Sequence, residues 1–425
     1  MAKAALLKTN QAIINYLKVH TLFPHDTELI VENLRDIKES VEGFVNQIYR
    51  IRGSNGHSVV MKQVLNLPIS RESTGDDGQP DAHLADWSLD MGRMRNEIAV
   101  LIFWNQICPD ICPDIYLFDE ENGIIVMEDL TDLSLLRYEF TRLHQFPLLG
   151  QQLGHFFAHN LFYSSSLNMT DYRHQKLVRF FENPEYSALD RFIFHENAIV
   201  SFHRTMPNQT LSLRKTLIED PHIQKEILRL EDLFLNHKEC LIHTDLHASN
   251  IMINSYMTKI IDTEFAGFGP VSQDFGRLTA SFVLNYFSWF GETGQNDNDE
   301  KQAYQEYLLK MIHDLYTTFA NVFTQLCNKH IATNYNLHQF DVSAYLKKHL
   351  TDALSFTALN ASSRIADRGL CHDLARLPVS ERIYPQQLIL TFCKTILTHE
   401  RAIDQIDDFV DVLRQLASFY PRHYF

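Results

Sequence analysis

The stretch that decides the fold is Leu241–Asn254, LIHTDLHASNIMIN, followed closely by Lys259–Phe265, KIIDTEF. The short apolar runs IMIN and KII are typical of two strands joined by a tight turn. Their polar neighbours Asp245, Asn250 and Asp262 are therefore expected to meet at the strand ends. Such a set suits phosphoryl transfer, which needs a carboxylate to orient the attacking hydroxyl and oxygen ligands that hold Mg²⁺ close behind it.

Each of these polar residues has a predicted role. We expect Asp245 to be the catalytic residue that orients the acceptor hydroxyl, and Asn250 and Asp262 to bind Mg²⁺. His243 is expected to support the loop rather than to act as a base. A lone acidic loop is usually a solvated turn, but HxDxxxxN, two flanking strands and IIDxE coincide here within 25 residues. This coincidence favours a functional site.

The rest of the chain divides into a strand-like and a helical portion. Strands are predicted at residues 44–52, 58–64, 115–118 and 124–128, and a helix at 91–106. GSNG, between the first two strands, is typical of a hairpin turn. Beyond residue 130 the pattern is mostly helical, for example at 148–163 and 221–235, apart from the strand-like island at 240–265.

This pattern predicts an α+β fold of two lobes. Residues 1–130 would form a β-rich, nucleotide-binding lobe, and residues 131–425 a mostly helical lobe that carries the catalytic loop and the substrate site. A hinge-like connection at 128–132 would join them. The cleft between two such lobes is a common place for a ligand.

A second predicted site element is Lys62, which lies in the apolar run VVMKQV. An ammonium group that faces a core is costly unless it is paired, and Glu97 on the following predicted helix is a natural partner. A Lys–Glu pair that holds ATP phosphates is the arrangement of kinases. Taken alone, Lys62 reads better as a charge on an edge strand, but together with the Asp245 stretch the kinase role is favoured.

The other predicted ATP contacts rest on weaker patterns. Gly43 and Asn46 in EGFVN can offer donors to phosphate, although this turn contains one glycine rather than GxGxxG. Glu128 and Leu130, at the end of a predicted strand, would place main-chain groups against adenine, and a plain connection between lobes would have the same geometry. The polar loop 68–86 has a length typical of functional or disordered segments.

Composition narrows the classes of function. The 425 residues carry 38 Lys plus Arg and 53 Asp plus Glu, a net charge of −15 that argues against nucleic-acid binding. Six Cys lack metal-site spacing, and the close pair Cys108 and Cys112 is not expected to form a disulfide or a metal site, so reduced thiols and a cytoplasmic location are expected. The chain contains no run of about 18 apolar residues, so no membrane span is predicted.

One further residue has a predicted structural role. Asp274 is expected to hydrogen-bond the catalytic-loop backbone.

Together these residues resemble 5-methylthioribose kinases, which lie in the protein-kinase-like superfamily with aminoglycoside and choline kinases. The family motif HGDLH is similar to His243–His247, and its metal-binding DxE matches Asp262–Glu264. The VxKQ strand is present at Val60–Gln63 and the hinge VMEDL at Val126–Leu130. The resemblance extends over roughly residues 40–400.

The resemblance implies a two-lobed kinase that uses ATP and Mg²⁺ to phosphorylate the 1-hydroxyl of methylthioribose in methionine salvage, typically as a homodimer. It implies that Asp262 and Glu264 bind Mg²⁺ and that Lys62 holds the ATP phosphates. It also implies that Arg364 contacts the substrate beside Asp245.

Three positions depart from the family pattern. Thr244 replaces the usual Gly of HGD, and Asn250 stands where Ser is usual. The family places two adjacent Arg near the sugar, whereas this chain has Ser363 before Arg364. A serine does not replace the bidentate donor that a guanidinium provides, so this change bears on the substrate rather than on the kinase chemistry.

Two other functions stay open at this level. A kinase of the same fold could act on another sugar, an aminoglycoside or an amino alcohol, and an acidic surface would suit a cationic acceptor. A non-catalytic nucleotide-binding protein on the same scaffold is less favoured, because the lysine, the catalytic carboxylate and the metal ligands are all present.

Overall fold

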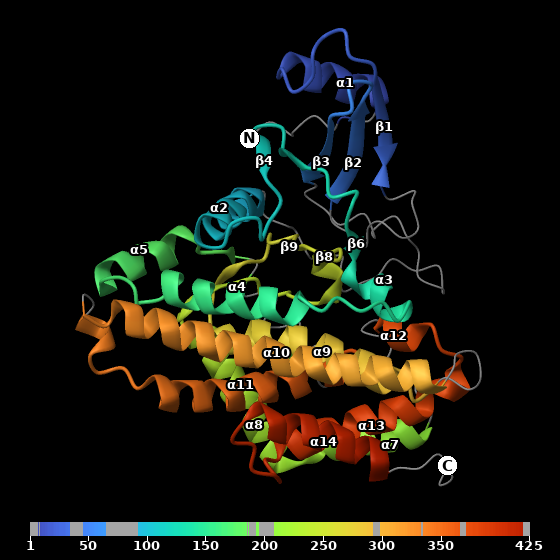
Figure 1. Ribbon diagram of the computed structural model, residues 1–425, viewed down its shortest axis with the longest axis vertical. Coiled ribbons are helices and arrows are strands. Elements are labelled where there is room, and N and C mark those ends of the chain that lie inside the picture. Colours follow the sequence, from blue (N-terminus) through green and yellow to red (C-terminus); the bar gives the residue numbers. More distant parts are fainter. Residues whose placement is uncertain are drawn as a thin grey trace.

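The computed structural model describes residues 7, 9–34, 46–64, 92–184, 186, 193–194, 208–291, 298–332, 335–365 and 371–419. The predicted phosphate turn at Gly43 and the loop 68–86 lie outside these residues. Within them a sheet-rich N-terminal part stands above a mostly helical remainder (Figure 1). The predicted α+β fold with two lobes is therefore confirmed.

The N-terminal part is built around a five-stranded antiparallel sheet with the order β1-β2-β3-β5-β4. Its elements are α1 (Asn10–Val19), β1 (Leu29–Asn33), β2 (Asn46–Gly53), β3 (Ser58–Val64), α2 (Gly92–Ile107), β4 (Ile115–Asp119) and β5 (Ile124–Glu128). Both predicted hairpins and the helix between them are present. α1 and β1 were not predicted, although Ile13 and Leu17 of α1 lie four residues apart on one buried face.

Strand alternation decides which face of this sheet carries the site. Met61 and its neighbours of the same parity pack with α1 in one apolar cluster. Lys62 points to the opposite face, where it is paired in register with Ile125 of β5, and Ile125 packs on α2. Because side chains alternate with a period of two, the apolar pattern of β3 sends Lys62 toward the helix that bears Glu97.

The remainder of the chain is mostly helical, with two small sheets of order β6-β8-β9 and β10-β7. Its elements are β6 (Ser134–Leu135), α3 (Leu136–Thr141), α4 (Leu149–Ser164), α5 (Asp171–Phe180), α7 (Asn208–Glu219), α8 (Pro221–Asn236), β7 (Cys240–Ile242), β8 (Ile251–Ile253), β9 (Thr258–Ile260), β10 (Gly267–Gly269), α9 (Val271–Ser288), α10 (Asn298–His330), α11 (Val342–Ser363), α12 (His372–Ala375), α13 (Val379–Leu397) and α14 (Ile406–Phe419). Short 3₁₀ helices span Ala248–Asn250 and Tyr335–Leu337.

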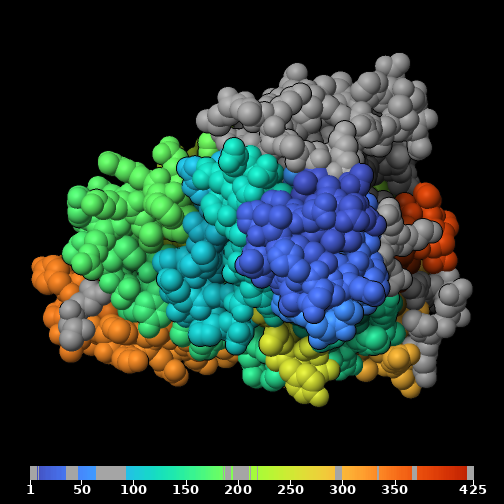
Figure 2. All heavy atoms as spheres, turned by 90° about the horizontal axis from the view of Figure 1, so that it is seen from above, coloured from blue at the N-terminus to red at the C-terminus, as the bar shows by residue number. Residues whose placement is uncertain are grey.

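The long helices form the platform on which the site rests. α4 packs on α10, and α9 packs on α11, within one large apolar core. Seen from above, the blue N-terminal part lies over the centre of this platform (Figure 2). Among the described residues no helix is both long and apolar enough to cross a membrane.

The α9–α11 contact depends on Gly276. A Cβ atom at this position would lie 2.5 Å from Cβ of Phe356 and 2.6 Å from the carbonyl oxygen of Ala353. Only a residue without a side chain allows the two backbones to approach so closely. This contact matters for the site, because Arg277 follows Gly276 directly and Asn360 lies one turn beyond Phe356.

We predict that Gly276→Ala lowers the free energy of unfolding by about 1–3 kcal/mol, because the added methyl must push α9 and α11 apart. Urea unfolding monitored by circular dichroism measures the change. Thr351→Ala, an exposed change on α11, serves as the matched control and is expected to leave the midpoint nearly unchanged. Equal midpoints for G276A and wild type would contradict the close packing.

His349 of α11 is a buried histidine without polar partners. Its ring lies 5.3 Å from that of Phe275 and 4.6 Å from that of Phe319, measured between centroids. Neither ring nitrogen has a hydrogen-bond partner among the described residues. Burial lowers the pKa of His349 to about 4, although the carboxylates of Glu239 and Asp352 favour its charged form. The native state therefore keeps this ring neutral.

A depressed histidine pKa makes the fold less stable in acid. The unfolded chain takes up a proton near pH 6.5 and the folded chain only near pH 4, so His349 is expected to remove about 3 kcal/mol as pH falls from 7 to 4. His349→Leu should flatten this part of the profile, measured by urea unfolding across that range. His338→Leu, at an exposed position, should keep the wild-type slope, and equal slopes in both variants would contradict the assignment.

Candidate active site

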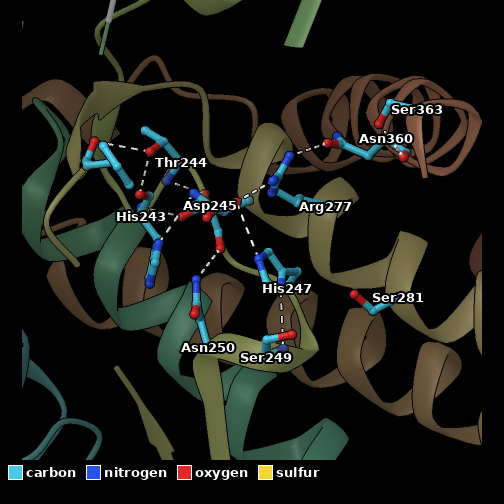
Figure 3. A network of polar contacts seen from close by, with 12 residues as sticks. His243, Thr244, Asp245, His247, Ser249, Asn250, Arg277, Ser281, Asn360 and Ser363 are labelled. Carbon is cyan, nitrogen blue, oxygen red and sulfur yellow. Dashed lines mark hydrogen bonds and ion pairs between the residues drawn. The ribbon is translucent and has the colours of Figure 1, made fainter. Parts of the chain in front are cut away.

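The predicted catalytic loop lies between the two small sheets. It leaves β7 after Ile242, passes Asp245, and re-enters regular structure at the 3₁₀ helix Ala248–Asn250. Strands β8 and β9 then form the predicted hairpin, and Asp262 follows directly after them. The local pattern of apolar strands and polar ends is therefore present as expected, and Figure 3 shows how the loop residues gather.

His243 braces this loop. Its Nδ1 accepts a hydrogen bond from the backbone N–H of Asp245 at 3.3 Å, so Nε2 carries the proton and donates to the carbonyl oxygen of Ile261 at 2.9 Å. The ring thus links the catalytic loop to the segment that leads into Asp262. Since both nitrogens are engaged, His243 is placed as a scaffold group and not as a base, as predicted.

Thr244 occupies the left-handed region, with φ of 71°. This conformation is strained for a β-branched residue, and it explains why the related motif carries glycine here. Two hydrogen bonds stabilise this unfavourable conformation. The Thr244 hydroxyl donates to the carbonyl oxygen of Phe265 at 3.0 Å, and the Thr244 carbonyl accepts from Gln273 Nε2 at 3.1 Å.

Asp274, the first acidic residue of α9, holds the same turn from beneath. Its two carboxylate oxygens accept the backbone N–H groups of His243 at 2.5 Å and Thr244 at 2.8 Å. The predicted bond between Asp274 and the catalytic-loop backbone is confirmed. Burial raises the pKa of Asp274 to about 6, against the opposing pull of these partners.

The carboxylate of Asp245 is held by Arg277 and His247. Arg277 of α9 forms a hydrogen-bonded ion pair with its Oδ1, and Nε2 of His247 lies 3.6 Å from the same oxygen. Burial tends to raise the pKa of Asp245, but Arg277 and His247 together hold it well below its usual range. Asp245 is therefore ionised, which fits a group that accepts a hydrogen bond from a hydroxyl.

Lys62 bridges the N-terminal sheet and the helical part. Its Nζ lies 2.8 Å from Oε1 of Glu97 and 2.7 Å from Oδ1 of Asp262. Burial tends to lower the pKa of Lys62, but the surrounding carboxylates raise it well above its ordinary value, so the ammonium group stays charged. The predicted Lys62–Glu97 pair is present, and Asp262 is a further partner of the same ammonium group.

A second cation, Arg93, lies beside this cluster. Its side chain is fully buried, with Nε 3.1 Å from Oε2 of Glu264 and an N–H that donates to Oδ1 of Asn46 at 3.1 Å. Asn46 in turn donates to Oε2 of Glu264 at 3.2 Å. The sequence interpretation did not include Arg93, although it lies four residues before Glu97 and hence on the same helix face.

The donor set suits a hard divalent cation such as Mg²⁺. Asp262 and Glu264 supply carboxylates, of which the Asp262 side chain is 36% exposed and that of Glu264 only 2%. Asn250 donates through Nδ2 to the carbonyl oxygen of Asp245 at 2.9 Å, which leaves Oδ1 as its acceptor atom. Mg²⁺ is usually bound by one or two protein carboxylates together with the phosphates of the substrate. In the described part of the chain, no group of three or more Asp, Glu, His or Cys side chains is placed to hold a metal ion by itself.

The predicted hinge is tied down by its side chains. Oε2 of Glu128 accepts from Nζ of Lys259 at 2.8 Å and from the backbone N–H of Asp114 at 3.1 Å. The Leu130 carbonyl accepts from the backbone N–H of Leu133 at 3.0 Å. The Glu128 carboxylate and its backbone N–H, which donates to the Asp114 carbonyl oxygen at 2.8 Å, are thus both engaged within the protein.

A pocket opens beside the catalytic loop, between α3, α9, α11 and α12. It is lined by Arg137, His247, Ala248, Ser249, Arg277, Ala280, Ser281, Leu284, Asn360, Arg364, Cys371, His372 and Asp373. Of the predicted substrate residues Arg364 is present in this lining. Ser363 is not, because its hydroxyl donates to the carbonyl oxygen of Asn360 at 2.8 Å and thereby extends the end of α11 (Figure 3).

Sequence reasoning missed the other cations of the site. Arg137, Arg277 and Arg93 are far from the motif stretch along the chain, and each lies in an ordinary helical pattern. A buried arginine costs free energy unless it is paired, so an Arg inside an otherwise apolar helix face is the signal that could have found them.

The strained turn at Thr244 yields a test. Thr244→Val keeps the unfavourable φ but removes the buried hydroxyl that bonds the Phe265 carbonyl oxygen, so we expect the free energy of unfolding to fall by about 1–3 kcal/mol. Thr244→Gly loses the same bond but relieves about 1–2 kcal/mol of left-handed strain, so it should be less destabilising. Urea unfolding of both variants gives the order, and a Gly variant less stable than the Val variant would contradict it.

Comparison with known proteins was made by family, by sequence and by structure. The model of the phosphotransferase enzyme family matches residues 126–308, which include the hinge, the catalytic loop and α9. Among solved structures, a glucosamine kinase in complex with glucosamine, ADP and phosphate has a TM-score of 0.45 at 12% identity, covering 97% of this chain and 84% of that chain. A choline kinase from Cryptosporidium parvum has a TM-score of 0.44 at 12% identity, covering 96% and 97%.

Curated relatives match almost the whole chain. Methylthioribose kinase 2 of Oryza sativa subsp. japonica is 29% identical over 391 residues, 88% of each chain. Methylthioribose kinase of Yersinia enterocolitica is 27% identical over 383 residues, 88% of this chain and 91% of the relative. With Lys62, Asp245 and Asp262 gathered as described, the chain is an ATP-dependent phosphotransferase with a hydroxyl acceptor, of protein-kinase-like fold, and it is similar over most of its length to methylthioribose kinases.

Proposed function

We propose that this protein phosphorylates the 1-hydroxyl of 5-methylthioribose with ATP and Mg²⁺. The observation that carries the proposal is the ion cluster in which Lys62 bridges Glu97 and Asp262, with Asp245 at the neighbouring pocket. The names of the relatives, which extend over most of the chain, support methylthioribose as the acceptor.

In this proposal the two parts of the chain hold the two substrates. Lys62, steadied by Glu97, binds ATP phosphate oxygens, and the main chain at Glu128 and Leu130 faces adenine. Asn46 and the turn at Gly43 would cover the phosphates. Mg²⁺ neutralises the phosphate charge when it is bound.

The proposed metal ligands lie at the two ends of the β8–β9 hairpin. Asp262, Glu264 and Asn250 would hold Mg²⁺, and Arg93 keeps the buried Glu264 charge compensated before the metal enters. Lys62 lies 2.7 Å from Asp262, so the metal and the lysine would share that carboxylate. This sharing ties metal binding to closure of the sheet on the helical part.

Asp245 acts on the acceptor. Its ionised carboxylate accepts the hydrogen bond of the attacking hydroxyl and aligns the oxygen with the γ-phosphorus. As the new P–O bond forms and the bond to ADP breaks, the hydroxyl proton passes to Asp245. Because Arg277 and His247 lower its pKa, Asp245 is a weak base, and its main contribution is orientation.

The charge of the pocket separates the candidate acceptors. Arg137, Arg277 and Arg364 all line it, and Asp373 is the one carboxylate among its lining residues. Such a pocket disfavours the ammonium groups of aminoglycosides and amino alcohols and favours a neutral sugar. Nearby side chains rather than the net charge of the chain set the local field, so a cationic acceptor is not favoured at this site.

Further features are part of the same proposal. We infer a cytoplasmic location, supported by six free and buried cysteines, including Cys108 and Cys112. A homodimer is inferred from the resemblance alone. The nucleotide-binding lobe is proposed to end near residue 130 and the substrate-binding lobe to comprise residues 131–425.

The test is ATP consumption by the purified protein with Mg²⁺ and a panel of methylthioribose, other sugars, aminoglycosides and amino alcohols. We expect methylthioribose-dependent turnover that vanishes in Asp245→Asn, because Asn cannot accept the proton or orient the hydroxyl as a carboxylate does. ATP binding, measured by thermal shift with and without Mg²⁺, should be nearly intact in D245N. Turnover retained by D245N would overturn its role, and turnover with a different acceptor alone would overturn the substrate.

A further inference from the structure

The feature that the proposed function leaves unexplained is Arg277. It extends from α9 into the acceptor pocket, with one terminal nitrogen on Oδ1 of Asp245 and NH1 2.9 Å from Oδ1 of Asn360 (Figure 3). The residue is 8% exposed, and its Nε has no hydrogen-bond partner among the described residues. One guanidinium thus spans the catalytic carboxylate and α11.

Asn360 fixes the orientation of this guanidinium. Its Nδ2 donates to the carbonyl oxygen of Phe356 at 2.8 Å and lies 3.3 Å from Oε1 of Gln273. The amide is therefore held with Oδ1 toward Arg277. Since α9 and α11 approach closely at Gly276, the whole arrangement is rigid, which is what a site needs to position a small acceptor.

A second guanidinium faces the same space. Arg364, at the end of α11, lines the pocket, and its side chain makes no hydrogen bond or ion pair with the described residues. Burial lowers the pKa of Arg364, and the nearby charge of Arg277 lowers it further. Arg277 is compensated by Asp245, whereas the charge of Arg364 would be compensated by oxygen atoms of a ligand in the pocket.

We propose, on the basis of the function proposed above, that Arg277 positions the acceptor and determines its specificity: together with Arg364 it binds oxygen atoms of a neutral polyhydroxy acceptor while its contact with Asp245 aligns the attacking hydroxyl. The two guanidiniums come from different helices, α9 and the end of α11. An acceptor that engages both spans the pocket and presents a hydroxyl to Asp245. An acceptor with an ammonium group meets two like charges and is rejected.

The planar fork of arginine is essential to this role. Its two terminal nitrogens contact Asp245 and Asn360 and each keeps a further N–H group for a ligand, whereas lysine has a single point charge. Positioning by Arg277 therefore affects the acceptor and not ATP, whose predicted contacts at Lys62 belong to the other side of the site. This separation makes the proposal testable by kinetics.

The experiment compares wild type with Arg277→Gln and Arg277→Lys, using methylthioribose and amino sugars as acceptors. We expect R277Q to lower kcat/KM for the acceptor by about 10²-fold, as loss of positioning commonly does, with the KM for ATP unchanged. R277K should recover part of the loss. The preference for neutral over ammonium-bearing acceptors should be strong in wild type and clearly smaller in R277Q.

Arg229→Gln is the matched control. Arg229 also forms guanidinium–carboxylate pairs, with Glu226 and Asp352, but lies outside the pocket. This variant is expected to keep wild-type kinetics and acceptor preference. If R277Q does not fold, R277K and Asn360→Ala carry the test: R277K keeps a cation beside Asp245 without the fork, and N360A keeps the fork but removes the contact that orients it.

The outcomes separate this proposal from the function on which it rests. If wild type phosphorylates another polyol and not methylthioribose, the proposed substrate fails, and Arg277 is tested with that polyol. If no acceptor is turned over, binding of the panel by calorimetry replaces kinetics. In the kinetic experiment, the role of Arg277 is overturned if R277Q keeps the acceptor preference of wild type or loses kcat/KM equally for ATP and for the acceptor. In the binding experiment, it is overturned if R277Q binds the acceptor as wild type does, or if neither protein binds it.

Discussion

The structure depends on one buried ammonium group. Nζ of Lys62 lies between Glu97 and Asp262, so a single charge from β3 holds a helix of the N-terminal part and the loop after β9 of the helical part. Removing such a charge from water costs several kcal/mol, and only close carboxylates offset that cost. The contacts of Lys62 therefore fix how the sheet and the helical part meet, at the place where we propose that phosphates bind.

In the catalytic loop, hydrogen bonds likewise offset an unfavourable backbone conformation. Thr244 is held in a left-handed conformation by its own hydroxyl and by Asp274, which takes the two backbone N–H groups at the turn. His243 adds a brace to the segment before Asp262. Strain and buried charge are tolerated here because several hydrogen bonds act on one short turn, and the result is a fixed position for Asp245.

Charge in this protein is organised locally rather than globally. The chain carries a net charge of −15, yet the acceptor pocket is lined by three arginines. Screening limits a surface charge to about 8–10 Å, so the pocket is governed by the side chains that face it. Arg277 connects that pocket to Asp245, because it lines the pocket and also pairs with the carboxylate that we propose orients the hydroxyl.

The sequence by itself determined the features that depend on neighbours along the chain. Both N-terminal hairpins, the β8–β9 turn that brings Asp245 near Asp262, and the direction of Lys62 follow from alternation and motif spacing over a few residues. Only the tertiary structure decided the partners of Asp245 and Glu264. Arg277 lies 32 residues from Asp245 and Asn360 83 residues from Arg277, and their helices meet because Gly276 lets two backbones approach. Such contacts depend on packing between distant helices, which no local pattern of residues encodes.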